Sequence, residues 1–309
     1  MRTQTTSHIL MVRPANFGYN EQTAENNAFQ LYDDSLSDNE IRVKALVEFD
    51  AFVECLKNEG VQVIVAEDSA SPAKPDAVFP NNWVTFHQEG FVITYPMFAP
   101  IRREERSESI IEQVLQQGFN STARLHFEAS EENDQFLEGT GSVIFDHVNK
   151  IAYAGLSPRT NDVLLDSLCE KIGYEAVTFR ALDAAGQEVY HTNVMMAMGE
   201  NFVVVCLGCI WDQKERAMLE NKFRETGKEI VNISLDQMNA FAGNMLQVKN
   251  KDGKLILVMS STAYESLTPD QITLLEGHTS LLHCPIDTIE TYGGGSARCM
   301  MAEVFLPKL

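Results

Sequence analysis

Four stretches of the chain share one pattern of hydrophobic and polar positions, in which two short apolar runs flank a polar turn. They are Asn81–Pro96, Gly141–Leu156, Asn193–Gly208 and Asn244–Met259. Short apolar runs bounded by turn residues are typical of β-strands, and two of them around one turn predict a hairpin. Each stretch therefore predicts a pair of antiparallel strands.

A segment with apolar residues at helical spacing follows each predicted hairpin and ends at a glycine. Glycine is a common helix terminator because it adopts left-handed backbone conformations without strain. The four segments cover residues 102–118, 159–173, 212–227 and 261–277. Each then leads into another short apolar run, which predicts a third strand, at 123–128, 175–181, 229–234 and 280–286.

The resulting order, strand–strand–helix–strand, recurs about every 50 to 60 residues and indicates a repeat architecture. A fifth copy can be assembled from the two ends of the chain: the strand Ile9–Arg13, the helix Asn39–Gly60, the strand Val61–Ala66 and the last strand Cys299–Leu306. Joining both ends in one unit would close a ring and remove an exposed sheet edge. We therefore expect an α/β fold, a five-bladed, pseudo-symmetric β/α propeller of ββαβ units, in which residues 1–309 form one domain around a central site.

Charge and composition narrow the class of protein. The chain has 24 basic and 44 acidic residues, a formal net charge of −20 at pH 7, and no basic stripe that could bind nucleic acid. Its apolar runs are far shorter than the roughly 18–20 residues of a membrane-spanning helix, and the run Ile9–Val12 is too short for a secretion signal. The six cysteines are scattered, unlike those of a small disulfide scaffold. We expect a cytoplasmic protein with free thiols and neither a nucleic-acid nor a membrane partner.

Cys299 is the candidate nucleophile. It lies in the sequence TYGGGSARCMM, where three glycines precede an Arg-Cys pair at the start of a predicted strand. A cysteine beside apolar residues is usually a small buried side chain, but a glycine run lets backbone and substrate approach closely. A thiol with a lowered pKa is the strongest nucleophile among ordinary side chains. Arg298 points to the opposite face of a strand, which favours a structural ion pair for it.

A nucleophilic cysteine needs a base, and His191 is the best placed of the seven histidines because it directly precedes the third hairpin. Glu138, in FLEGTGSVIF, occupies the corresponding place before the second hairpin and could orient an imidazole. The histidines at termini or turns, where a solvated position is expected, are His8, His87, His147 and His278. The pair Cys206-x-x-Cys209 has no second pair of metal ligands, which favours buried thiols. No metal or organic cofactor is expected.

Together these motifs resemble the guanidine-modifying superfamily of arginine deiminases, dimethylarginine dimethylaminohydrolases and glycine amidinotransferases. PDAVFPNNW is similar to a dimethylargininase stretch with acidic substrate-binding residues, here Asp76, and the similarity extends to FLEGTGSVIF, GLSPRTN and GGGSARCMM. VRPANFGYN, NNAFQ and FAGNMLQ most resemble the citrulline-utilisation hydrolase branch. The resemblance covers nearly the whole chain. It implies the five-bladed pentein fold, with Cys299 as nucleophile, His191 as general acid and base, and Glu138 as acidic partner.

The resemblance also implies that Arg102 and Arg159 bind the α-carboxylate of an amino acid, although a helix-start arginine and a surface arginine would explain them too. Asn81 and Asn82 stand where relatives carry carboxylates that face a guanidinium, and Asn193 stands where arginine deiminases often carry aspartate. Exchanging such a charged pair for amides would weaken guanidinium binding by about 2–5 kcal/mol. A neutral ureido group would lose nothing, since an amide offers it both a donor and an acceptor.

The sequence therefore favours a hydrolase of non-peptide C–N bonds that converts citrulline to ornithine, ammonia and carbon dioxide through a covalent Cys299 intermediate. Alternatives with the same chemistry are an arginine deiminase or dimethylargininase and, less favoured, an amidinotransferase. An alternative of another class is a catalytically silent propeller that binds amino acids. The expected partner is a small amino-acid substrate, and the sequence is compatible with both a monomer and a homo-oligomer. The loop Asn16–Asn20 is either a lid with Gly18 as its hinge or an ordinary loop.

Overall fold

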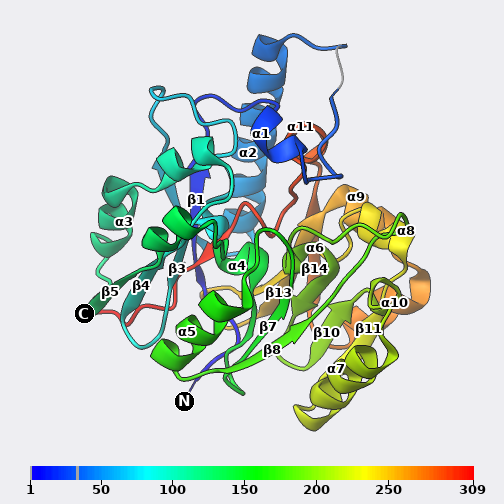
Figure 1. The fold of residues 1–309 in the computed structure, drawn as a ribbon. Coiled ribbons are helices and arrows are strands. Elements are labelled where there is room, and N and C mark those ends of the chain that lie inside the picture. Colours follow the sequence, from blue (N-terminus) through cyan, green and yellow to red (C-terminus); the bar gives the residue numbers. More distant parts are fainter. Residues whose placement is uncertain (1, 33–34) are drawn as a thin grey trace.

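The computed structural model describes residues 2–32 and 35–309, and within them it contains five three-stranded β-sheets flanked by helices (Figure 1). In each sheet the central strand pairs antiparallel with one neighbour and parallel with the other. A parallel pair needs a crossover, which a helical segment supplies in each repeat. This arrangement confirms the predicted ββαβ units.

Four sheets follow the chain order. They are β3 (Val84–Phe86), β4 (Phe91–Thr94) and β5 (Ala123–His126); β6 (Ile144–Asp146), β7 (Ile151–Gly155) and β8 (Glu175–Phe179); β9 (Met196–Met198), β10 (Phe202–Val205) and β11 (Glu229–Asn232); and β12 (Leu246–Lys249), β13 (Leu255–Ser260) and β14 (Ser280–Cys284). Each central strand is almost fully buried, whereas the third strand of each sheet is more exposed. The central strands thus carry the buried apolar runs that the pattern predicted.

The fifth sheet joins the two ends of the chain. Its strands are β15 (Ala302–Glu303), β1 (His8–Arg13) and β2 (Gln62–Glu67), and β1 pairs antiparallel with β15. The expectation of a strand over Cys299–Leu306 is wrong in its extent. Backbone N–H groups of Cys299, Met300 and Met301 donate to carbonyls three residues earlier, so this segment forms tight turns. Cys299 therefore lies in a turn before the strand, with its backbone fixed by local hydrogen bonds.

The longest helix is α2 (Asp38–Asn58), which begins with a capping box between Ser37 and Glu40. α5 (Asp162–Ile172) and α7 (Gln213–Glu225) confirm two other predicted helices. The helices expected over 102–118 and 261–277 are each split, into η2 (Pro100–Glu105) with α3 (Glu108–Leu115), and α9 (Ser261–Ser266) with α10 (Pro269–Glu276). Pro269 explains the second break, because proline is tolerated in the first turn of a helix but not in its interior.

The remaining helical segments are short. They are α1 (Glu21–Ala24), η1 (Pro80–Asn82), η3 (Glu128–Asn133), α4 (Gly139–Ser142), α6 (Thr192–Met195), η4 (Leu207–Cys209), α8 (Leu235–Asn239) and α11 (Asp287–Gly293). Three of them directly precede the first strand of a hairpin, and α4 contacts both η1 and α6. The starts of successive hairpins therefore meet in one region. In the described part of the chain, no helix has both the length and the apolar character needed to cross a membrane.

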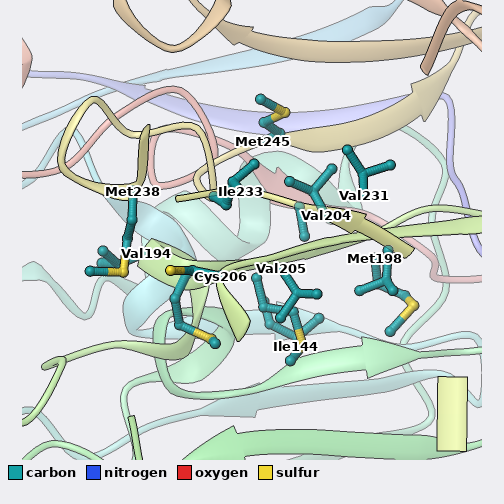
Figure 2. Close-up of a cluster of buried hydrophobic side chains, with 14 of the residues drawn as sticks. Ile144, Val194, Met198, Val204, Val205, Cys206, Val231, Ile233, Met238 and Met245 are labelled. Carbon is teal, nitrogen blue, oxygen red and sulfur yellow. The ribbon is translucent and has the colours of Figure 1, made fainter. Parts of the chain in front are cut away.

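Buried side chains form several hydrophobic clusters, one of which surrounds β9, β10 and β11 (Figure 2). Cys206 and Cys209 belong to this cluster and are fully buried, which confirms that they are core thiols. They lie at the end of β10 and in η4, where Cys209 Sγ donates to the Cys206 carbonyl. Among the described residues no group of metal-ligating side chains is assembled, here or elsewhere.

Candidate active site

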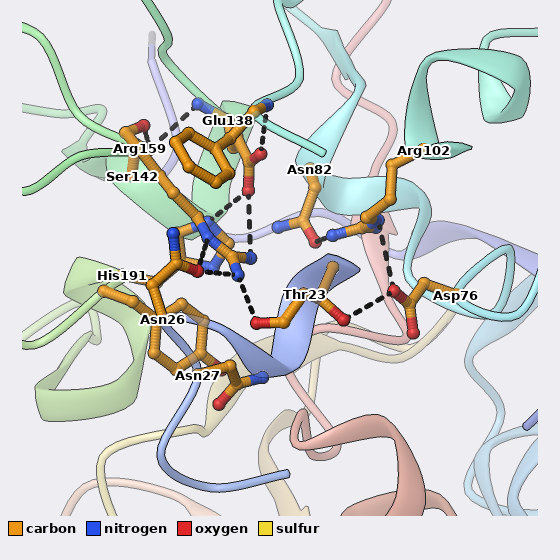
Figure 3. Close-up of polar contacts among 12 residues, drawn as sticks. Thr23, Asn26, Asn27, Asp76, Asn82, Arg102, Glu138, Ser142, Arg159 and His191 are labelled. Carbon is orange, nitrogen blue, oxygen red and sulfur yellow. Dashed lines mark hydrogen bonds and ion pairs between the residues drawn. The ribbon is translucent and has the colours of Figure 1, made fainter. Parts of the chain in front are cut away.

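His191 and Glu138 form a buried pair at the starts of two neighbouring hairpins (Figure 3). His191 Nε2 lies 2.7 Å from Glu138 Oε2, and Glu138 Oε1 accepts a 2.8 Å hydrogen bond from the backbone N–H of Phe98. Burial would raise the pKa of Glu138, but the charge of Arg159 and the hydrogen bond from His191 lower that pKa to about 2. Burial lowers the pKa of His191 to about 4, against the opposing effect of Glu138. At neutral pH the pair is therefore an ionised carboxylate that accepts a hydrogen bond from a neutral imidazole.

Glycines in the Glu-Gly-Thr-Gly segment allow this pair to form. A Cβ on Gly141 would lie 2.4 Å from Asn82 Nδ2 and 2.7 Å from His191 Cε1. Gly139 has a φ of +48°, and a Cβ there would lie 2.2 Å from the Asn81 carbonyl oxygen. Any larger residue at Gly141 would therefore overlap the Asn82 amide and the His191 imidazole.

Replacing Gly141 by alanine is therefore expected to disrupt the site. We expect the His191 imidazole to lose its contact with Glu138 and the protein to be destabilised by about 1–3 kcal/mol, as for overpacked core positions. Histidine NMR signals and urea denaturation would measure both effects. Gly208→Ala is the matched control, because its Cβ would come no closer than 4.0 Å to a non-neighbouring atom. Equal behaviour of the two variants would contradict the steric account.

The Cys299 thiol is buried and accepts contacts from two side-chain amides. Asn193 Nδ2 lies 3.4 Å from Sγ, and Asn244 Nδ2 lies 3.3 Å from it. Asn193 was a predicted substrate-binding residue, and the structure places it against the sulfur. The sequence reasoning did not select Asn244, although it starts the fourth predicted hairpin just as Asn193 starts the third. Its position in the repeat, which is equivalent to that of Asn193, could have identified Asn244 as a candidate site residue.

The two predicted carboxylate-binding arginines are buried, so Arg159 is not a surface residue. Arg159 contacts Asn26 Oδ1 and the Thr23 carbonyl, lies 3.6 Å from Glu138 Oε2, and packs over the ring of Tyr190. Its guanidinium thus connects the α1 segment to the His191–Glu138 pair (Figure 3).

Arg102 is held by a different set of partners. It forms a two-point ion pair with Glu105 at 2.8 and 2.9 Å, and its Nη1 donates to Asn82 Oδ1 at 2.9 Å. Asp76 Oδ2 lies 3.7 Å from Arg102 Nε. Asp76 also accepts a 2.7 Å hydrogen bond from Asn20, while its Oδ1 is buried without a partner. Arg102 thus fixes Asn82 and Asp76 together.

The two neighbouring asparagines differ in what they face. Asn82 lines the cavity beside Cys299 and His191, with its oxygen bound to Arg102 and its Nδ2 buried without a partner. Asn81 is also fully buried, and neither polar atom of its side chain has a partner, but it does not line this cavity. Of the two amides predicted to meet the substrate, the structure brings only Asn82 to the cavity.

Most of the predicted site residues line one cavity. Its lining consists of Thr23, Asn27, Asp76, Phe79, Asn82, Arg102, Arg159, Tyr190, His191, Gly293, Gly294, Gly295 and Cys299. Glu138 and Asn193 lie just behind it, in contact with His191 and Cys299. The accessible volume is about 10 Å³, room for about one water molecule. Thr23 and Asn27, from the segment around α1, close one side of it.

Comparison with known proteins then assigns the family. The model of a family described as N,N dimethylarginine dimethylhydrolase, eukaryotic, matches residues 13–306, almost the whole chain. The chain belongs to this family. It is therefore a member of the guanidine-modifying pentein superfamily, as its motifs predicted. No curated protein matches it significantly.

Solved structures of other superfamily members share its fold. The apo arginine dihydrolase ArgZ from cyanobacteria superposes with a TM-score of 0.74 at 18% identity, over 98% of this chain and 41% of that one. The N-terminal domain of ArgZ with a covalently bound reaction intermediate gives a TM-score of 0.72 at 17% identity, over 97% and 99% of the two chains. A dimethylarginine dimethylaminohydrolase adduct with S-methyl-L-thiocitrulline gives 0.64 at 17% identity, over 97% and 99%. The chain thus spans about two fifths of the ArgZ chain in the apo structure.

Other residues that the sequence singled out lie outside the site of this family member. Arg298 pairs with Glu303 at 2.8 Å and donates to the Met301 carbonyl, which confirms its structural role. The expectation that His87 and His147 are solvated is wrong, because both are buried and their rings pack against Phe145. The backbone N–H of His147 donates to Gln4 Oε1, so the N-terminal segment covers this hairpin turn.

Proposed function

We propose that the protein is a cysteine-dependent hydrolase that converts citrulline to ornithine, ammonia and carbon dioxide. We also propose that its five sheets are the blades of one closed propeller over residues 1–309, with the cavity at the centre. The joining of β1 and β15 in one sheet supports closure, as do contacts between the first strands β15 and β3, β6 and β9, and β9 and β12.

One observation carries the choice of citrulline, namely the unpaired amide atoms beside Cys299. Arg102 can only donate, so it fixes the oxygen of Asn82 toward itself and leaves the Nδ2 donor of this cavity-lining residue without a partner. Asn193 shows the converse, since its Nδ2 contacts the sulfur and its Oδ1 is buried without a partner. A ureido group offers an oxygen acceptor to Asn82 and an NH₂ donor to Asn193. A guanidinium has no acceptor and would leave the Asn82 donor unpaired, which typically costs about 1–3 kcal/mol.

Charged groups farther along the cavity suit the amino-acid end of citrulline. Arg159 is proposed to bind the α-carboxylate, because its cavity-side partners are an amide oxygen and a carbonyl of the α1 segment, which a carboxylate can replace. Arg102 is neutralised by Glu105 and is better suited to hold Asn82. The unpaired Oδ1 of Asp76 is available to the α-ammonium group.

The first step forms a covalent intermediate. Because the Nε2–H of His191 is bound to Glu138, Nδ1 is its free basic atom and accepts the thiol proton as Cys299 Sγ attacks the ureido carbon. Asn82 Nδ2 can donate to the oxyanion that develops on the ureido oxygen. The imidazolium, stabilised by Glu138, then gives its proton to the departing NH₂ group. Ammonia leaves, and the carbon remains bonded to sulfur and to the side-chain nitrogen of the substrate.

In the second step His191 and Cys299 exchange protons in the opposite direction, and the product is released. His191 takes a proton from water, which attacks the thiocarbamate carbon, and the C–S bond breaks to restore the thiol. The product carbamate loses carbon dioxide and yields ornithine. His191 thus carries the proton both in the formation and in the hydrolysis of the covalent intermediate.

The α1 segment is proposed to act as a lid. A cavity of about 10 Å³ cannot admit an amino acid, so a bounding segment must move. Thr23 and Asn27 line the cavity, and Arg159 contacts Asn26 where we place the substrate carboxylate. A Cβ on Gly18 would have no non-neighbouring atom within 4 Å, and this open surrounding suits the predicted hinge.

A second candidate function is the hydrolysis of arginine, because ArgZ is described as an arginine dihydrolase and shares the fold. Dimethylargininase activity is a related alternative, given the family description. A product assay separates these functions: citrulline, arginine and dimethylarginine are supplied in parallel, and ornithine, citrulline and ammonia are measured. We expect ornithine and ammonia from citrulline alone. Turnover of arginine or dimethylarginine would reject the proposed specificity, and no turnover of any substrate would favour an amino-acid-binding protein.

Exchanging Asn82 for aspartate tests the role of the unpaired donor. We expect kcat/KM for citrulline to fall by about 10²–10³-fold, because the carboxylate removes an oxyanion donor and repels the developing charge. Arginine should bind more tightly to this variant than to the unaltered protein, as equilibrium calorimetry would show. The matched control is Asn221→Asp, the same charge change at an exposed position of α7. Unchanged citrulline kinetics in Asn82→Asp would remove the donor from the mechanism.

A further inference from the structure

Two side-chain amides contact the sulfur of Cys299, and the reaction scheme above gives Asn244 no role. Asn244 Nδ2 and Asn193 Nδ2 approach Sγ to 3.3 and 3.4 Å, from the starts of two neighbouring hairpins. We propose that Asn244 is a further catalytic residue that, together with Asn193, forms an amide cradle stabilising and aiming the Cys299 thiolate.

The orientation of the Asn244 carboxamide is fixed by the turn that carries Cys299. Its Oδ1 accepts hydrogen bonds from the backbone N–H groups of Arg298 at 3.0 Å and Cys299 at 3.4 Å. Backbone N–H groups only donate, so the oxygen must face them and the NH₂ group must face the sulfur. The same NH₂ group also donates to the Asn193 carbonyl at 2.9 Å. The donor aimed at Sγ is therefore set by the protein backbone.

The local fold is built for this contact. The backbone N–H of Asn244 donates to the Phe241 carbonyl at 2.8 Å, which closes a tight turn ahead of β12. A Cβ on the adjoining Gly243 would lie 2.2 Å from the Val194 carbonyl oxygen, so the close approach of this turn to α6 requires glycine. Asn244 itself is only 1% exposed. The contact is thus part of a tightly packed junction between two repeats.

A buried thiolate needs hydrogen-bond donors, and these amides meet that need. The neighbouring Arg298 directs its guanidinium to the Met301 carbonyl and to Glu303 instead. Hydrogen bonds to the charged form of a group favour that form. Two amide N–H groups can therefore stabilise the thiolate while keeping the sulfur free on its cavity side. The inference rests on the proposed role of Cys299 as nucleophile and is independent of which substrate is attacked.

The test is the alkylation of Cys299 by iodoacetamide as a function of pH, followed by mass spectrometry of the peptide that contains it. In Asn244→Asp one carboxylate oxygen can still accept from the backbone, but the donor to sulfur is replaced by an acceptor. We expect alkylation at neutral pH to slow about tenfold, with the midpoint of the pH profile moved up by about one unit. Asn193→Ala, which removes the other donor, should shift the profile in the same direction.

The shape of the pH profile separates this role from a merely structural one. If Asn244 only supports the turn, its variants will be alkylated at altered rates with an unchanged midpoint, and the cradle is wrong. A second measurement needs no variant: the side-chain NH₂ signals of Asn193 and Asn244 in NMR spectra should shift together when Cys299 is alkylated. Signals that do not move would overturn the proposal, even if the variants fail to fold.

These outcomes are distinguishable from failure of the proposed function. Alkylation requires no substrate, so a shifted profile supports the cradle even if citrulline is not turned over. Conversely, turnover of citrulline with an unchanged profile would support the hydrolase and reject the cradle.

Discussion

Changing Cys299 to serine is expected to lower kcat for citrulline by about 10⁴-fold or more, while leaving the fold intact. A hydroxyl is a far weaker nucleophile than a thiol at neutral pH and needs a stronger base to activate it. A serine hydroxyl is also far less acidic than a thiol, so it gives up its proton to the His191 imidazole much less readily. The two amides that contact the sulfur would still find an oxygen acceptor in serine.

The measurement is the release of ornithine and ammonia, with thermal unfolding recorded in parallel. Cys169→Ser is the matched control, because Cys169 is another buried free thiol, in α5 and away from the cavity. It should lose stability but retain kcat. With the unaltered protein, rapid acid quenching during turnover should trap an adduct on Cys299 that contains the ornithine chain. Full turnover by Cys299→Ser would refute the covalent scheme.

Much of the architecture could be predicted from local pattern. The hairpins and the strand after each helix follow from short-range periodicity, so their order revealed the repeat. The same logic placed His191 and Glu138 at equivalent positions of two repeats, and the structure joins them at 2.7 Å. Because each hairpin starts in the same region, sequence position within a repeat translated into spatial proximity.

Other features depend on contacts between segments that are distant in the sequence, so local patterns could not predict them. His87 and His147 were predicted to be solvated because they lie in turns. In the structure the N-terminal segment covers this region, and Gln4 donates a hydrogen bond to the carbonyl of Phe145. Asn81 and Asn82 are adjacent in one 3₁₀ turn, where neighbouring side chains point in different directions, and only the structure shows which one meets the cavity. Cys299 lies in turns whose hydrogen bonds are local, so its apolar neighbours were mistaken for a longer strand.

Changing Glu138 to glutamine is expected to affect both catalysis and stability. We expect kcat for citrulline to fall by about 10²–10⁴-fold, the range for loss of general acid–base catalysis, because a neutral amide stabilises the His191 imidazolium poorly. Arg159 lies 3.6 Å from the Glu138 carboxylate and is itself 1% exposed, so its charge would lose a buried partner. Breaking such a pair typically destabilises a protein by about 3–5 kcal/mol.

The stability difference between the unaltered protein and Glu138→Gln should also depend on pH in a characteristic way. The folded-state pKa of Glu138 is about 2, below its ordinary value of 4.5, so the ionised carboxylate stabilises the fold fully above pH 4.5. That contribution is lost as the pH falls from 4.5 toward about 2. In urea denaturation, the gap between the unaltered protein and Glu138→Gln should therefore be constant from neutral pH down to about 4.5 and narrow below it.

A matched variant distinguishes the catalytic role of Glu138 from that of any buried acid. Asp146 is fully buried and lies 3.4 Å from Lys228 Nζ, outside the cavity lining. Asp146→Asn should be destabilised like Glu138→Gln but should keep its kcat at a temperature where it is folded. Because Glu138 acts on the substrate only through His191, Glu138→Gln should lower kcat far more than it raises KM. A variant that loses stability but turns over citrulline normally would show that Glu138 supports the fold and leaves His191 to act alone.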